Sequence, residues 1–145
     1  MTKHPPVTPW RSLTVANCLT LGLAVAHVLE EQVRAPLPLQ AWATLAPVLL
    51  ALAIGTAAAS VHSRVGLGLS IGANLSLAVA AGVSHLWPAS PDYAGRIADA
   101  WGGPLGLLWA TVAVLLWAAA LGALALGVAA AVRVASRHEE RPFAA

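Results

Sequence analysis

Four long apolar runs, separated by short polar segments, dominate the pattern of the chain. A helix needs about 20 apolar residues to cross the hydrocarbon core of a bilayer, and each run reaches that length. The chain shows no strand signal and no internal repeat, so we expect an all-α integral membrane protein, a four-transmembrane-helix bundle over residues 1–145. The expected spans run approximately over 12–33, 41–62, 65–87 and 104–133, between cytoplasmic tails at 1–11 and 134–145.

Polar and proline-rich segments mark the ends of these spans. Ser12 is expected to cap the first helix, Pro88 follows the end of the third, and Pro104 is well placed as the first residue of the fourth. Residues 88–102 form the longest loop, in which Arg96 to Trp101 are expected to form a short interfacial helix.

The basic residues predict how the bundle is oriented. With both termini inside, six basic residues are cytoplasmic and two are outside, which agrees with the positive-inside rule. An arginine-rich and alanine-rich composition is typical of GC-rich bacterial genomes, so we expect a multi-pass protein of a bacterial inner membrane with N- and C-termini cytoplasmic. The inner set is Lys3, Arg11, Arg64, Arg133, Arg137 and Arg141, and the outer set is Arg34 and Arg96.

Composition limits the classes of function. Only 10% of the residues are charged, against about 25% in soluble domains, so there is no room for a separate soluble domain. The net charge of +2 is spread over the helix ends, so we expect a lipid bilayer and no nucleic acid as partner. Cys18 is the only cysteine, which excludes an intrachain disulfide and a cysteine-based zinc site.

One face of the first span is polar or small along its whole length. His27, Glu30 and Glu31 stand out on or beside it, because ionisable side chains inside a membrane helix are costly and usually functional. A similar stripe on the third span ends at His85, so these four side chains converge if the two spans are neighbours, with Asp92 and Asp99 above them. The faces are Asn17, Thr20, Ala24, His27, Glu31 and Arg34 on the first span, and Ser70, Asn74, Ala78, Ala81 and His85 on the third.

Two chemistries fit this cluster. His27, Glu30 and Glu31 are candidate catalytic residues, in which a histidine and a carboxyl group act as an acid/base pair. His27, Glu31 and His85 are candidate ligands of a divalent metal, zinc or iron, because imidazoles and carboxylates suit these ions. Either site would lie near the outer leaflet, and a membrane-embedded enzyme of unknown reaction is one function that such a site could serve.

Other interpretations of the same residues stay open. Glu30 and Glu31 can lie at the water interface, and His85 can be a surface group. His27 can be an interior histidine bonded to Asn74 or to a backbone carbonyl. His27 and His85 can also be axial ligands of a haem in a non-catalytic subunit of a larger membrane complex, although His85 is the shallower of the two. A further alternative is a small proton-coupled transporter that works as a homo-oligomer.

The pentad His27-Val28-Leu29-Glu30-Glu31 resembles the motif that names the HXXEE family of small bacterial membrane proteins. In that family the motif also lies in the first predicted helix of a multi-span chain. Such proteins tend to have an Asn followed closely by a His in a later span, and here Asn74 and His85 are eleven residues apart. The resemblance implies that His27, Glu30 and Glu31 form a site, and it supplies no reaction.

Overall fold

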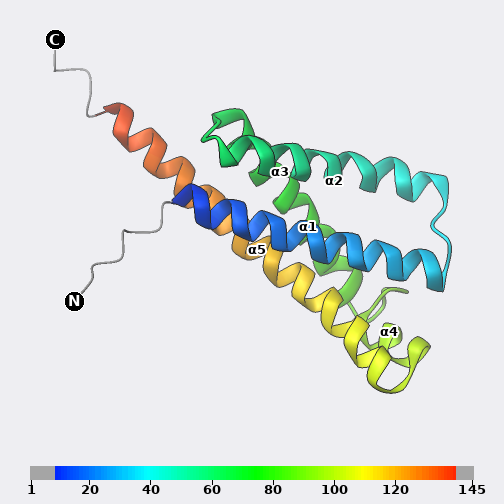
Figure 1. Cartoon of the computed structure of the whole chain (residues 1–145). Coiled ribbons are helices and arrows are strands. Elements are labelled where there is room, and N and C mark those ends of the chain that lie inside the picture. Colours follow the sequence, from blue (N-terminus) through cyan, green and yellow to red (C-terminus); the bar gives the residue numbers. More distant parts are fainter. Residues whose placement is uncertain (1–8, 140–145) are drawn as a thin grey trace, which may run out of the picture.

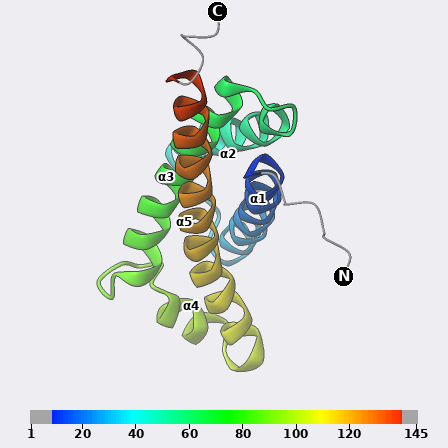
Figure 2. The same ribbon diagram turned by 90° about the vertical axis from the view of Figure 1, so that its left-hand side faces the viewer.

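A computed structural model describes residues 9–139, with side chains for 9–136, and it is all-α (Figure 1). Helix α5 packs along both α1 and α3, and α2 packs more closely on α3 than on α1. The short helix α4 lies beside the start of α5, as Figure 2 shows from the side. The elements are α1 (Pro9–Arg34), α2 (Leu39–Ser60), α3 (Arg64–Ala81), the π-helical turn η1 (Gly82–Leu86), α4 (Ala94–Trp101) and α5 (Gly103–Glu139).

Four of these helices are long and apolar enough to cross a membrane. Their outward faces carry large apolar side chains. Leu19, Val65 and Leu107, for example, are each more than half exposed. A surface of this kind is stable against lipid and not against water, so the chain is a multi-pass membrane protein. The predicted fold class, an all-α four-helix bundle, is confirmed. The candidate spans are Pro9–Arg34, Leu39–Ser60, Arg64–Leu86 and Gly103–Ser136.

The helix ends differ from the predicted ends in two places. Helix α1 begins at Pro9, so Ser12 lies inside the helix and the prediction that it caps the helix is wrong. Proline is favoured at the first helical position because its missing N–H would have no partner there anyway. At the other end, α5 continues to Glu139, beyond the predicted end of the span. The remaining predicted tails, 1–8 and 140–145, lie outside the described residues.

Small residues bring α2 and α3 together as a tight hairpin. Ser63 caps α3 by accepting a hydrogen bond from the Gly66 N–H at 3.3 Å. A Cβ at Gly66 would lie 2.6 Å from atoms of Ala58, so the two helices touch there through their backbones. His62 completes the turn with a φ of 60°, in the left-handed region.

The loop after η1 folds back toward α1, and this places α4 over one end of the bundle. Gly102 and Gly103 have φ values of 65° and 49°, which glycine adopts without strain. Gly106 then lies against the backbone of Ala98, where no side chain would fit, and Ile97 of α4 is fully buried. The predicted short helix in this loop is therefore present, and it faces the end of α1.

Replacing Gly66 by alanine is expected to destabilise the α2–α3 hairpin, because the added Cβ has no space against Ala58. Thermal unfolding in detergent should show a loss of about 1–3 kcal/mol, the usual cost of overpacking. Gly68→Ala is the matched control on the same helix, since a Cβ there meets nothing within 4 Å. Equal stability of the two variants would contradict the close backbone contact.

Candidate functional site

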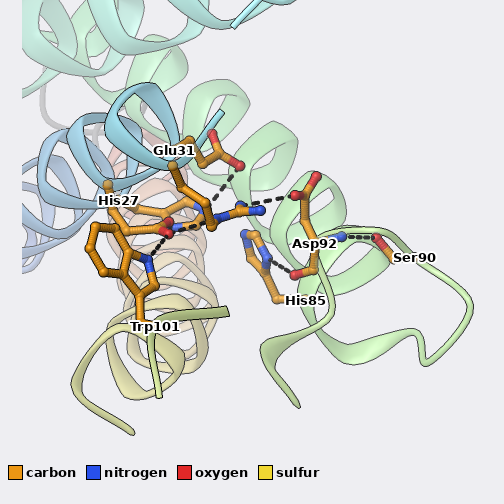
Figure 3. A network of polar contacts seen from close by, with 8 residues as sticks. His27, Glu31, His85, Ser90, Asp92 and Trp101 are labelled. Atoms are coloured by element: carbon orange, nitrogen blue, oxygen red, sulfur yellow. Dashed lines mark hydrogen bonds and ion pairs between the residues drawn. The ribbon is translucent and has the colours of Figure 1, made fainter. Parts of the chain in front are cut away.

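The polar residues predicted from α1 and α3 meet at the end of the bundle that α4 covers (Figure 3). The rings of His27 and His85 contact each other edge to face, with centroids 4.4 Å apart and an interplanar angle of 87°. Both histidines are buried, with exposed fractions of 4% and 3%. The interpretation of His85 as a surface group is therefore wrong, and the conditional prediction that the two spans bring these histidines together agrees with the structure.

Glu30 is the most deeply buried acid of the described chain. Its side chain is 0% exposed, and Oε1 accepts hydrogen bonds from Arg34 Nε at 2.8 Å and from Trp101 Nε1 at 2.7 Å. A buried carboxylate is tolerated only when it is paired and hydrogen-bonded, and here Oε1 meets both conditions while Oε2 has no hydrogen-bond partner. Glu30 is shielded from solvent because α4 brings Trp101 over it, and its depth relative to the water interface stays a prediction.

Asp92 joins the loop to both sides of the cluster. Its Oδ1 accepts a hydrogen bond from Arg34 Nη2 at 3.1 Å, and its main-chain carbonyl lies 2.9 Å from His85 Nδ1. The Asp92 N–H donates to Ser90 Oγ at 3.2 Å within the same turn. The loop thus holds α1 through an ion pair and His85 through a backbone bond.

The hydrogen bond to Asp92 determines the tautomer of His85. A carbonyl oxygen can only accept, so Nδ1 of His85 carries the hydrogen, and in the neutral ring Nε2 keeps its lone pair. His85 lies in the π-helical turn η1, and such turns inside helices occur frequently at functional sites. Gly82 begins this turn, and the Trp117 indole packs directly against it.

His27 lies between two carboxylates. Its Nδ1 is 3.6 Å from Glu30 Oε2, and its Nε2 is 3.3 Å from Glu31 Oε1, although neither nitrogen makes a hydrogen bond in this geometry. A neutral imidazole has one N–H, so one nitrogen lone pair would face a carboxylate oxygen. The repulsion disappears when one more proton is held on His27 or Glu31. The arrangement is thus suited to holding an exchangeable proton.

A cavity of about 130 Å³ opens beside this pair. His27, Glu31, Ser84 and His85 are the polar residues that line it, and alanine and leucine side chains form most of the remaining wall. The Glu31 side chain is 17% exposed, in contrast to Glu30. Proton donors and acceptors therefore face a space in which a small group could bind.

Two predicted contacts are not made. Asn74 bonds to Asn17 and to the Ser70 carbonyl, deeper in the bundle, so the interpretation that His27 is held by Asn74 is wrong. Asp99 lies beside Gly102 on the surface of α4 and does not reach the cluster. Asp92 is the loop acid that does.

The observed arrangement of the described side chains does not fit a metal ion or a haem. Within the described part of the chain, no three His, Cys, Asp or Glu side chains are arranged to hold a metal ion. The two imidazole rings are also in direct contact, which leaves no room for a haem plane between them. The zinc or iron site at His27, Glu31 and His85 therefore stays a prediction that requires the side chains to move.

Trp101 and Ser84 belong to the site and were not predicted from the sequence. The sequence predicts only that Trp101 ends a short interfacial helix, and the membrane interface is the usual place of tryptophan. The one feature of the sequence that could have indicated its role is its position in an amphipathic segment after Asp92.

Comparisons with protein-family models, curated proteins and solved structures found no match to this chain.

Trp101→Phe is expected to destabilise the protein, because it removes the indole donor to Glu30 and keeps an aromatic ring. Hydrogen bonds to charged groups are worth about 1.5–3 kcal/mol, and chemical unfolding in detergent measures the loss. Trp87→Phe is the control, since Trp87 is 65% exposed. Two equally stable variants would rule out the Trp101–Glu30 bond.

We also expect neutral His85 to carry its hydrogen on Nδ1. Nitrogen NMR of histidine-labelled protein distinguishes the two tautomers at a pH where the ring is neutral. Asp92→Asn should leave this tautomer unchanged, because the acceptor is the main-chain carbonyl. A neutral ring protonated on Nε2 would contradict the geometry at η1.

Proposed function

We propose that this protein carries out acid/base chemistry at a site formed by His27, Glu31 and His85, and that it is a membrane-embedded enzyme. One observation carries the proposal: a buried imidazole, flanked by two carboxylates, lies at the wall of a cavity. Buried titratable groups that face a cavity are the usual sign of an active site.

The three groups would divide the proton transfers between them. His85 is the base, since Nε2 of the neutral ring can accept a proton from a bound hydroxyl group. The His27–Glu31 pair is the acid and returns a proton to the substrate. Glu30, which Arg34 and Trp101 hold in place, lies 3.6 Å from His27 Nδ1 and acts on the ring through its charge, without the hydrogen bond that the carboxylate of a catalytic triad makes to its histidine. Positioned acids and bases of this kind contribute about 10²–10⁴-fold to rates.

The distribution of acids favours chemistry over proton transport. All four carboxylates with described side chains, Glu30, Glu31, Asp92 and Asp99, belong to the end of the bundle that α4 covers. The polar groups deeper in the bundle, Asn17, Ser70, Asn74 and Thr20, do not titrate. A transported proton would find no chain of acids across these described residues, whereas a local acid/base site needs none.

We further propose that the site lies near the outer leaflet of a bacterial inner membrane, with both termini cytoplasmic. Arg11, Arg64 and Arg133 belong to the end where α1 begins and α5 ends, and Arg34 and Arg96 belong to the end that carries the site. The positive-inside rule supports this orientation. Membership of the HXXEE family is a related proposal, supported by the shared network of His27, Glu30 and Glu31.

A product search tests the acid/base proposal without assuming a substrate. Lipid and water-soluble extracts of bacterial cells are incubated with purified wild-type protein, with Glu31→Gln and with His62→Gln, and are then compared by mass spectrometry. His62 contacts Trp10 at the opposite end, so its variant is the control. We expect a species that wild type and His62→Gln both convert, and that Glu31→Gln converts about 10²-fold more slowly or worse. Conversion that persists in Glu31→Gln would contradict the proposal.

Metal content of the same samples tests the metal version of the site. About one zinc or iron per chain in the wild type, absent from a His27→Ala, Glu31→Ala double variant, would favour metal chemistry. We expect no such difference between the wild type and the double variant.

A further inference from the structure

The cavity beside His27 opens on the lipid-facing surface of the bundle. Ala80 of α3 lines the cavity and is exposed, and Leu45 of α2 lines it and is partly exposed. Two neighbours of Ala80 on the outer surface are apolar, since Val79 is 59% exposed and Val83 is 64% exposed, and the exposed Ser76 donates its hydroxyl hydrogen to the Gly72 carbonyl of its own helix. A molecule that enters past Ala80 would therefore come sideways from the bilayer.

The size of the cavity limits what can enter. Its volume of about 130 Å³ is close to that of a cavity of about 150 Å³ that holds one benzene molecule. A ring-sized group fits, and a whole lipid does not. The rest of a lipid-soluble molecule would remain outside, against the apolar faces of α2 and α3.

The charges around the cavity determine whether the polar group of a bound molecule can be charged. No lysine or arginine is among the described residues that line the cavity. Arg34, the nearest cation of the network, already donates to Glu30 and Asp92. A phosphate or carboxylate group would face Glu31 without a cation, whereas an uncharged hydroxyl group can donate to His85 Nε2 and accept from the His27–Glu31 pair.

We infer that the cavity binds the ring-sized, uncharged end of a lipophilic alcohol or phenol that enters from the bilayer between α2 and α3. The inference rests on the proposed function for the groups that would react with the hydroxyl. Binding itself depends only on the cavity and its mouth. The two proposals can therefore fail separately.

Binding of 4-decylphenol to protein in lipid nanodiscs tests the inference. Its Kd is measured by competition with a photoreactive alkylphenol, and the labelled peptides are found by mass spectrometry. Ala80→Phe fills the mouth from an exposed position and should raise the Kd about tenfold or more. Val79→Phe is the matched control on the neighbouring lipid-facing position and should keep the wild-type Kd.

Leu45→Trp, on the other side of the mouth, is a second variant that should weaken binding in the same way. Decyl phosphate should fail to compete, because its head is anionic. Wild-type affinity in both mouth variants, or decyl phosphate competing as well as decylphenol, would overturn the inference.

The product search separates the two proposals. Phenol binding without any conversion that depends on Glu31 would reject the acid/base proposal and leave the binding site standing. Conversion by Ala80→Phe at the wild-type rate would reject entry from the bilayer and leave the acid/base proposal standing.

Discussion

The burial of the Glu30 carboxylate is the constraint on which the rest of the site depends. An acid that is fully removed from solvent within an apolar bundle requires a cation and hydrogen-bond donors close by. Arg34 comes from the next turn of the same helix, at the i, i+4 spacing, and Trp101 comes from α4. The burial of Glu30 therefore requires that the loop folds back over the end of α1, because this brings Trp101 to the carboxylate.

This constraint also orders the groups around it. With Oε1 of Glu30 occupied, Oε2 faces His27, and the ring of His27 then presents its other nitrogen to Glu31. Arg34 reaches past Glu30 to Asp92, whose carbonyl fixes His85. Hydrogen bonds thus link Glu30 to Arg34, Arg34 to Asp92 and Asp92 to His85, whereas His27 lies between Glu30 and Glu31 without a hydrogen bond. Glu31 and His85 both line the cavity.

Much of the fold could be predicted from the sequence, because the thickness of the bilayer fixes the length of an apolar helix. The inward direction of His27 also follows from helical periodicity along α1. The burial of Glu30 could not be predicted, because it depends on Trp101, seventy-one residues away, and on the turn at Gly102 and Gly103. Helical periodicity shows which residues of one helix share a face, and it carries no information about contacts between distant segments such as α1 and α4.

The inward position of His85 was predicted from the stripe on the third span, since His85 follows Ala81 at helical spacing. The π-helical turn η1 that carries His85 was not predicted, because periodicity does not distinguish such a turn from an α-helix. The tautomer of His85 could not be predicted either, because it depends on the main-chain carbonyl of Asp92 in the following loop.

The most direct test of this account is a double-mutant cycle on Glu30 and Arg34. The free energies of unfolding of Glu30→Gln, Arg34→Gln and the double variant are compared with that of the wild type in the same detergent. Residues in one buried ion-pair network show interaction energies of about 0.5–3 kcal/mol, and we expect a value in the upper part of that range. Additive effects of the two substitutions would mean that Glu30 is not held by Arg34, and the order of groups from Glu30 to the cavity would then be wrong.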